Sequence, residues 1–390
     1  MEQRQNRARS AKQRARAQKT RLGMIVAAIL AAVILLLDLA TILTPDRSYS
    51  DQENRMLAQA PVLSGAKLAD GSFFSDTESY FSDQFAGRDT WMGLNLARAR
   101  LFGAKENGGV YLGRGGYLMQ VPSEPDEEAL ARNLQAINAF AKRHSELKIY
   151  MSTVPNAFCV LSKRLPAGAP VRDQEADIRN IAASLQGVQF LDVTAALKEH
   201  SKEALYYRTD HHWTSLGAKY AFEAMAPGLG IAPETEYEIY TVTTEFQGTL
   251  ASRSGDHSAK DTIELYVPKW NVEYSVNYRD SQTTVCSLYS RAALEEKDQY
   301  TVFFGGNHPR IDIKTTSESS RVLLVLKDSY ANCFIQFLTP YFKEIVMVDP
   351  RYYYDNLETL VKQENVTDVL LLYNTDTFLT DTALADVLGE

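Results

Sequence analysis

The sequence predicts an α/β fold in which a parallel sheet is covered by helices on both faces. Two observations indicate this class: short, almost continuous apolar runs, and polar helical stretches that separate them. The apolar runs lie at 148–154, 188–192, 322–326, 345–348 and 369–373. Strands of this kind, alternating with helices, are typical of a parallel sheet with both faces buried. The chain has 390 residues, 45% of them hydrophobic, which is enough for a large core and excludes a disordered chain or a disulfide-held miniprotein.

The charged residues are distributed unevenly along the chain. Residues 1–22 hold eight basic residues and one acidic residue, whereas residues 44–390 hold 33 basic and 47 acidic residues and carry a net charge of −14. An acidic body argues against nucleic acid as the main partner. The three cysteines are an odd number without metal-ligand spacing, so they predict neither a disulfide framework nor a zinc site.

An apolar run separates the basic and acidic regions. Residues 22–43 are almost entirely apolar, close to the length of about 20 residues that a helix needs to cross a bilayer. We expect a transmembrane helix over 23–43, with 1–22 as a basic tail held in the cytoplasm and the rest of the chain outside the cell. A cleaved signal peptide is the alternative, but the run is long for one and no small-x-small cleavage site follows it.

The outer part of the chain divides into two predicted regions. Residues 44–120 are polar and turn-rich, with an aromatic segment at 73–102, and predict a stalk and packing arm. Residues 121–390 form the α/β domain, with helical stretches at 129–144 and 173–186 between its strands. Between about 230 and 319 the pattern changes to alternating strands such as 272–278, which predicts a β-rich insertion.

Ser329 follows one predicted strand at the point where a helix should begin. The strand 322–326 is followed by Lys327-Asp328-Ser329-Tyr330, and 331–338 reads as a helix. In open α/β sheets, reactive groups gather at the carboxyl ends of the strands. A serine there can attack a carbonyl while nearby backbone amides hold the developing oxyanion. The alternative is that Ser329 only caps the helix.

A second candidate element is the stretch Asp210-His211-His212-Trp213. If this stretch is extended, Asp210 and His212 share one side and His211 faces away. A carboxylate beside an imidazole selects the ring's tautomer and supports its positive charge after it takes a serine proton. Metal ligation by the two histidines, or a polar loop stacked on Trp213, are the alternatives. Further zinc ligands in a recognisable pattern are missing from the sequence, so we expect no metal.

A third element is Asn374, which follows the strand 369–373. Its amide can donate a hydrogen bond to an oxyanion. Asparagine before polar residues is also ordinary turn chemistry.

Together these elements resemble the sequence blocks of SGNH hydrolases in permuted order. The Asp-x-His-Trp-Thr arrangement before the serine strand is similar to the alginate O-acetyltransferase group of SGNH-like proteins. The literal DHHW string at 210–213, together with QENR at 52–55, FAGRD at 85–89 and FGGN at 304–307, resembles the DHHW protein family of Gram-positive bacteria. The resemblance covers nearly all of the chain after the apolar helix, and it implies an SGNH-hydrolase-like sheet flanked by helices.

The resemblance also implies roles for individual residues. Ser329 corresponds to the nucleophile, His212 to the general base and Asp210 to the residue that orients it. Asn374 corresponds to the oxyanion asparagine. Separately from the resemblance, we expect Trp213 and Tyr330 to contact substrate. The chain departs from the hydrolase pattern in the lysine before Asp-Ser and in an Asp–His spacing that is one residue shorter. Alginate-type acetyltransferases share the shorter spacing, which favours acyl transfer.

We therefore expect a membrane-anchored, extracellular O-acyltransferase, by resemblance an O-acetyltransferase, that modifies a cell-envelope polysaccharide or exopolysaccharide without a cofactor. By the same resemblance, a polytopic membrane O-acyltransferase would supply the acyl group. Two alternatives remain: a carbohydrate esterase that uses the same triad with water, and a non-catalytic protein of polysaccharide export. In the second, Trp213, Tyr207 and Trp91 would stack on sugars, although buried aromatic residues are the commoner case.

Overall fold

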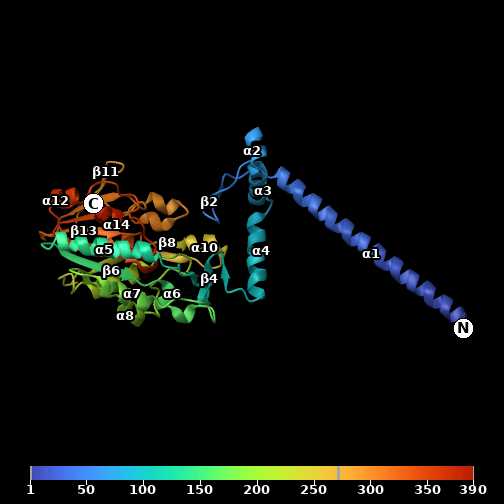
Figure 1. The fold of residues 1–390 in the computed structure, drawn as a ribbon, viewed down its shortest axis with the longest axis horizontal. Helices are drawn as coiled ribbons and strands as arrows, with labels where there is room; N and C mark the ends of the chain where they lie inside the picture. The colour runs from blue at the N-terminus through green and yellow to red at the C-terminus, as the bar shows by residue number, and fades with distance from the viewer. Residues whose placement is uncertain (1, 270–272, 390) are drawn as a thin grey trace. The chain divides into compact units, whose positions relative to one another are not determined.

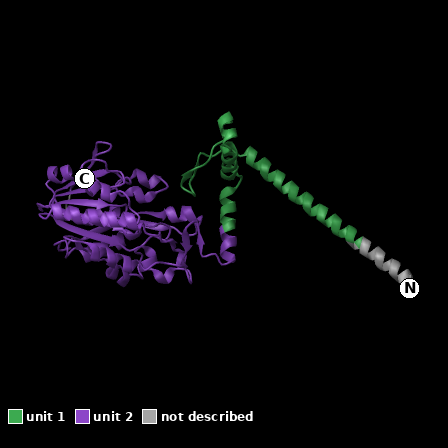
Figure 2. Ribbon diagram, viewed as in Figure 1, with its two compact units in different colours: residues 1–95 green, residues 96–390 purple. Residues whose placement is uncertain are grey.

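The chain forms two compact units. The computed structural model describes residues 2–269 and 273–389, with side chains from Arg14 onward except that of Ala15. Four basic side chains of the predicted tail, Arg4, Arg7, Arg9 and Lys12, therefore lie outside the described residues. Unit 1 is Met1–Asn95 and unit 2 is Leu96–Glu390 (Figures 1 and 2).

Unit 1 begins with one long helix, α1 (Glu2–Leu43). Its segment Arg16–Leu43 is long and apolar enough to cross a membrane, and none of its most apolar stretch is buried against protein. At its end the Thr41 hydroxyl donates to the carbonyl of Leu37, which satisfies the hydroxyl within the helix. The predicted apolar helix is thus present, while its orientation in a membrane remains a prediction.

The remainder of unit 1 is a short hairpin and a helical arm. Two-residue strands pair antiparallel in the hairpin, and Asp83 and Gln84 at the end of the second arm helix are buried. The elements are β1 (Tyr49–Ser50), β2 (Arg55–Met56), α2 (Gly65–Ala69), α3 (Ser72–Gln84) and α4 (Arg88–Leu101), the last of which continues into unit 2.

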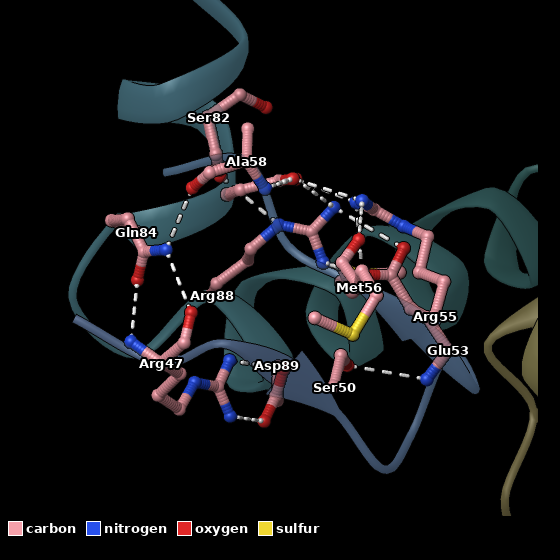
Figure 3. Close-up of polar contacts among 12 residues, drawn as sticks. Arg47, Ser50, Glu53, Arg55, Met56, Ala58, Ser82, Gln84, Arg88 and Asp89 are labelled. Atoms are coloured by element: carbon pink, nitrogen blue, oxygen red, sulfur yellow. Dashed lines mark hydrogen bonds and ion pairs between the residues drawn. The ribbon is translucent and has the colours of Figure 1, made fainter. Parts of the chain in front are cut away.

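Ion pairs join the hairpin to the turn between α3 and α4 (Figure 3). Arg55 pairs with Asp83 at 2.5 Å, and Arg88 pairs with Glu53. The motifs 52–55 and 85–89 of the sequence therefore contact each other and form one polar cluster, which we call the hairpin cluster. Within the same unit the backbone N–H of Ala86 donates to the Thr41 hydroxyl oxygen, which ties the turn to the end of α1.

Unit 2 includes a small three-stranded sheet that precedes the main domain. Val110 and Leu118 of this sheet pack with Leu250 and Ala251 of α10 in one buried cluster. The predicted stalk boundary at residue 120 therefore differs from the division between the units, because residues 106–120 pack within unit 2. The elements are β3 (Glu106–Asn107), β4 (Val110–Leu112), η1 (Arg114–Gly116), β5 (Leu118–Gln120) and α10 (Thr249–Ser254).

The main sheet of unit 2 has eight strands in the order β11-β10-β12-β14-β13-β15-β6-β7. The strands from β14 to β7 are parallel, as predicted, whereas β12 runs antiparallel to both β14 and β10. The strands are β6 (Lys148–Val154), β7 (Gln189–Phe190), β10 (Tyr274–Tyr278), β11 (Thr283–Val285), β12 (Arg310–Thr315), β13 (Val322–Lys327), β14 (Glu344–Val348) and β15 (Asp368–Asn374).

The predicted β-rich insertion at about 230–319 is only partly separate, because some of its strands join the predicted parallel strands in one mixed sheet. β10, β11 and β12 extend the main sheet, while β8 (Tyr237–Phe246) and β9 (Asp261–Pro268) form their own two-stranded ribbon. Strands at the edge of a sheet keep one face partly exposed, so polar and apolar residues alternate along them. The central strands are almost continuously apolar, and the sequence of the edge strands therefore resembles that of a separate region. Two 3₁₀ turns, η3 (Ala292–Glu295) and η4 (Gln299–Val302), complete this part of the chain.

Helices cover both faces of the sheet, and each face has its own hydrophobic cluster. Alternate residues of β13 belong to different clusters. Leu323 and Val325 pack in the cluster on one face, and Leu324 and Leu326 pack in the cluster on the other face. This alternation is the period of a strand that is buried on both sides. One face carries α5 (Glu127–Arg143), α7 (Gln174–Ser184), α12 (Leu357–Gln363), α13 (Thr375–Phe378) and α14 (Leu384–Gly389). The other carries α6 (Ala157–Val160), α8 (Thr194–Glu199), α9 (Ser215–Met225), α11 (Ala331–Phe334) and η5 (Ile335–Phe337), and η2 (Ser162–Arg164) follows α6.

Candidate active site at the carboxyl edge of the sheet

Two neighbouring parallel strands place Ser329 and Asn374 at the same edge of the sheet. The register pairs Lys327 at the end of β13 with Leu372 of β15, and β15 continues beside β6 to its last residue, Asn374. Ser329 remains partly exposed, and α11 begins two residues after it. The predicted helix 331–338 is shorter than expected and continues from α11 as a 3₁₀ turn.

The carboxylate of Asp328 holds this strand-to-helix turn. It accepts hydrogen bonds from the backbone N–H of Tyr330 at 2.9 Å and of Asn374 at 2.8 Å. Burial raises the pKa of Asp328, and these two hydrogen bonds oppose the shift. Asp328 thus links the β13 turn to the end of β15 and fixes the backbone on either side of Ser329.

The stretch 208–212 supplies a histidine and a carboxylate in direct contact. The His212 Nδ1 lies 2.5 Å from Asp210 Oδ1, and both side chains are buried. The chain bends through 208–212, between Tyr206 and Trp213, which pair as an isolated bridge. The expectation that His211 faces away was wrong, because a bend does not alternate side chains: the ring centroids of the two histidines are 3.9 Å apart.

A segment far along the sequence holds the second oxygen of Asp210. The backbone N–H of Thr249 donates to Asp210 Oδ2 at 2.8 Å, and the Thr249 hydroxyl donates at 3.0 Å. Burial disfavours the charged carboxylate, but the charges of His211 and His212 and these hydrogen bonds hold the pKa of Asp210 well below its usual range. Asp210 is therefore an anion with both oxygens engaged.

The structure brings Ser329 and His212 together. The Ser329 Oγ lies 2.8 Å from His212 Nε2, so serine, imidazole and carboxylate form one hydrogen-bonded row. Tyr300 of η4 stacks on the imidazole with centroids 3.8 Å apart and an interplanar angle of 13°. Its hydroxyl also donates to the Ser329 carbonyl oxygen at 3.0 Å, so one side chain contacts both groups.

Within the described part of the chain, the side chain of Asn374 is engaged through its oxygen but not through its nitrogen. Its Oδ1 accepts from Asn156 Nδ2 at 3.2 Å and from the backbone N–H of Thr377 at 3.1 Å, and it caps α13. Its Nδ2 is buried without a hydrogen-bond partner among the described residues. Turn capping and a spare amide donor thus coexist, and the oxyanion role of Asn374 remains a prediction.

Trp213 and Tyr330 do not fit the predicted contact with substrate. The two side chains are 0% and 1% exposed, and Trp213 Nε1 donates to the Tyr330 carbonyl oxygen at 2.9 Å. The Tyr330 hydroxyl donates to the His211 carbonyl oxygen, so both rings support the histidine turn from inside the core. Tyr207, another suggested sugar platform, is likewise buried, whereas Trp91 of unit 1 is exposed.

Lys327 is buried behind the site and does not line its mouth. Its Nζ lies 2.9 Å from Asn332 Oδ1, 3.3 Å from Asn307 Oδ1 and 3.4 Å from Asp349 Oδ2, and the side chain has no exposed surface. Burial lowers the pKa of Lys327, and the charge of Asp349 opposes this. Lys327 therefore ties the end of β13 to α11 and to the 304–308 loop.

One set of side chains at the site offers donors that a metal could use. The ligand atoms of Asp210, His211 and His212 lie within 4.8 Å of one another. However, His212 is hydrogen-bonded at both ring nitrogens, and His211 Nδ1 is 2.8 Å from the Thr249 hydroxyl oxygen. The donor set is arranged as a proton relay, and its hydrogen bonds would have to break before a cation could bind.

The sequence could not indicate the contacts that Thr249 and Tyr300 make. Both residues come from segments that are distant from the DHHW string and the serine turn. Thr249 is the first residue of α10 and follows Gly248, and this pair reads equally well as an ordinary helix start.

Comparisons with known proteins support the fold and the class of protein. Residues 114–307 match the family model for the SGNH hydrolase-like domain of the acetyltransferase AlgX. The match includes Asp210 and His212, while Ser329 lies beyond it. The alginate biosynthesis protein AlgX of Azotobacter vinelandii is 31% identical over 139 residues, which are 32% of this chain and 27% of the relative. The chain thus matches about a quarter of the length of that relative.

Two solved structures are similar over most of the chain. A DHHW family protein from Eubacterium siraeum has a TM-score of 0.65 and 25% identity, covering 73% of this chain and 96% of that chain. PatB1 of Bacillus cereus has a TM-score of 0.58 and 18% identity, covering 69% of this chain and 96% of that chain.

The chain is therefore similar to the SGNH hydrolase-like domain of AlgX over residues 114–307, and its SGNH-like α/β fold confirms the predicted fold class. Within that class, its resemblance to the DHHW family is also confirmed. These relatives support the expectation that the chain is an enzyme.

Proposed function

We propose that the protein is a membrane-anchored O-acetyltransferase that acts outside the cytoplasmic membrane on a polysaccharide, with Ser329, His212 and Asp210 as its triad. The observation that carries the proposal is the continuous row from Ser329 Oγ to His212 Nε2 and from His212 Nδ1 to Asp210 Oδ1, at 2.8 and 2.5 Å. The similarity to an acetyltransferase domain and to an alginate biosynthesis protein supports the reaction type and the polysaccharide class.

In the first half of the reaction, Ser329 takes the acetyl group. His212 Nε2 accepts the hydroxyl proton as Ser329 Oγ attacks the carbonyl carbon of an acetyl ester, and Asp210 supports the imidazolium. The tetrahedral oxyanion is stabilised by the backbone N–H of Ser329 and by the Asn374 amide. As the ester bond breaks, His212 returns the proton to the leaving alkoxide, and acetyl-Ser329 remains.

In the second half, a sugar hydroxyl takes the acetyl group. His212 removes the hydroxyl proton, the sugar oxygen attacks the acetyl carbon, and the proton then passes to Ser329 Oγ as the ester to serine breaks. The chain needs no cofactor for this chemistry. Helix α1 would keep the site close to a membrane protein that supplies the acetyl group.

Acetyl transfer by the full chain in detergent micelles tests the proposal. We expect the wild type to cleave p-nitrophenyl acetate, to carry acetyl on Ser329 in peptide mass spectra, and to pass it to an oligosaccharide acceptor. Ser329→Ala should lose all three properties, whereas Ser184→Ala, at the exposed end of α7, should keep them. Acetate release without any transfer would assign an esterase, and acetylation that persists in Ser329→Ala would refute the triad.

A further inference from the structure

A hollow lies on the same edge of the sheet as Ser329, outside the site described above. Its volume is about 460 Å³, within the range of ligand pockets. The lining includes the rings of Tyr278 and Tyr289, the hydroxyls of Thr283 and Ser287, and the loop around Gly305. Rings beside hydroxyl groups are suited to bind a sugar, because its C–H face packs on aromatic carbon while its hydroxyls exchange hydrogen bonds.

The strand register places the hollow at the same edge of the sheet as the candidate nucleophile. β10 runs in the same direction as β13, and pairing across the sheet aligns Tyr278 with Ile311, Ile311 with Met347, and Met347 with Val325. Tyr278 therefore ends its strand at the carboxyl edge from which Ser329 emerges. Three strand spacings of about 4.8 Å separate the two strands, or roughly 14 Å.

The loop 304–308 connects the hollow to the serine turn. Phe304, Gly305 and His308 line the hollow, while Asn307 Oδ1 accepts hydrogen bonds from Lys327 Nζ and Asn332 Nδ2, two residues that flank Ser329 in the sequence. Gly306 has a φ of 114°, which only glycine adopts readily, so this part of the loop presents bare backbone. A bound chain can pass closely over such a surface.

The charges at the hollow are already paired. His308 is the only titratable side chain apart from tyrosine among its described lining residues, and its Nδ1 lies 2.8 Å from Asp280 Oδ2. Its Nε2 lies 3.1 Å from the Phe304 carbonyl oxygen, so the ring is held at both nitrogens. The carboxylate of a uronate would therefore lose its hydration in the hollow and find no unpaired cation on the described lining to compensate for it. A neutral sugar has no charge to desolvate, so its binding does not carry this free-energy cost.

We propose that this hollow is an acceptor subsite for a neutral sugar unit, about 14 Å from the serine strand, so that the polysaccharide chain runs along the carboxyl edge over the 304–308 loop. This inference rests on the proposed function for its place in the reaction. The predicted specificity does not follow from the proposed function: the subsite prefers an uncharged glycan over a polyuronate.

Binding measured by calorimetry on full-length Ser329→Ala protein in detergent micelles tests the subsite without turnover. We expect cellotetraose or N-acetylchitotetraose to bind and tetramannuronate to bind at least tenfold more weakly. Thr283, exposed on β11 opposite Tyr278, lines the hollow, and Thr284 points to the other face of the same strand. Adding Thr283→Trp should weaken binding of the neutral probe at least tenfold, and adding Thr284→Trp should leave it unchanged.

The outcomes separate this proposal from the acetyltransferase proposal. The circular dichroism spectrum and the thermal midpoint of Thr283→Trp should match those of the wild type, which shows that the variant folds. Failure of both neutral probes to bind, binding that is insensitive to Thr283→Trp, or tighter binding of tetramannuronate would each overturn the subsite while the triad stands. Loss of ester cleavage in the wild type with intact, Thr283-dependent binding would overturn only the enzyme.

Discussion

At the scale of single residues, Gly248 is the position on which the placement of Asp210 depends most directly. A Cβ added at Gly248 would lie 2.2 Å from Asp210 Oδ2 and 2.3 Å from its Cβ. The φ of Gly248 is −86°, which any residue adopts, so contact and not backbone strain makes glycine necessary. Gly248→Ala must displace the carboxylate, and we expect kcat for p-nitrophenyl acetate to fall by about 10²-fold or more. Gly65→Ala is the control, because its added Cβ meets nothing within 4 Å. Wild-type turnover in Gly248→Ala would contradict this account.

Asp298, near the same carboxylate, makes stability depend on pH. Burial, and then the negative charge of Asp210, raises the pKa of Asp298 to about 6. Since an unfolded aspartate titrates near pH 4, the folded chain holds a proton between about pH 4 and 6 that the unfolded chain has released. The free energy of unfolding of the wild type therefore falls as pH rises through this interval.

Asp298→Asn removes this titration. The variant should gain about 2 kcal/mol relative to the wild type between pH 4 and pH 7, with most of the gain below about pH 6. Urea unfolding followed by tryptophan fluorescence measures the difference, because Trp213 is fully buried in unit 2. A difference that stays constant with pH would show that Asp298 ionises normally in the folded chain.

The residue types of the proposed triad could be predicted from the sequence, but their support could not. Serine after a buried strand and an Asp/His pair carry recognisable chemistry, and the carboxyl-edge rule implies that such residues can meet. Tyr300 and Gly248 support the pair from other segments, and nothing local in the sequence indicates contacts across that separation. Trp213 was misassigned as a sugar contact because sequence does not reveal whether an aromatic ring is exposed.

At the scale of elements, the central strands were predictable and the edge of the sheet was not. β6, β13, β14 and β15 are buried on both faces, so their apolar runs identify them directly. β10 alternates because one of its faces is less covered, and only pairing with β12 shows that it extends the same sheet. A strand's pattern reports its burial, whereas its neighbours are set by long-range pairing.

The ion pairs of the hairpin cluster predict how strongly the segment 49–95 of unit 1 resists local opening. Arg88 and Glu53 each have only 14% of their side chain exposed. Arg88→Met would leave Glu53 partly buried without this partner, and we expect the free energy of local opening of 49–95 to fall by about 2–3 kcal/mol. The Arg47–Asp89 pair is more exposed, so Arg47→Met should lower it by less than about 1 kcal/mol.

Hydrogen exchange of the full chain in micelles measures both variants of the hairpin cluster. Faster exchange confined to 49–95 in Arg88→Met, with unit 2 unchanged, is the expected result. Equal effects of Arg88→Met and Arg47→Met would mean that burial does not strengthen the inner ion pair.

At the scale of the whole molecule, the distribution of charge and hydropathy predicts that the two ends of the chain lie on opposite sides of a membrane. The basic tail, the apolar α1 and the acidic remainder together predict that the tail lies in the cytoplasm and unit 2 outside. The proposed reaction needs that orientation, because its polysaccharide acceptor is outside the cytoplasm. The three cysteines provide a native reporter for it, since Cys286 is exposed, Cys159 is partly buried and Cys333 is buried.

A membrane-impermeant maleimide applied to protoplasts should therefore label the wild-type chain at Cys286. Burial raises the pKa of Cys159 to about 11 and that of Cys333 to about 12, so few thiolates form at these positions and they should stay unlabelled. Cys286→Ser should abolish labelling, and Ser10→Cys in that background should be labelled only after the membrane is permeabilised. Because a single span puts its two ends on opposite sides, labelling of Cys286 only after permeabilisation would place unit 2 in the cytoplasm. An extracellular acceptor would then be excluded, whatever the geometry of Ser329 and His212.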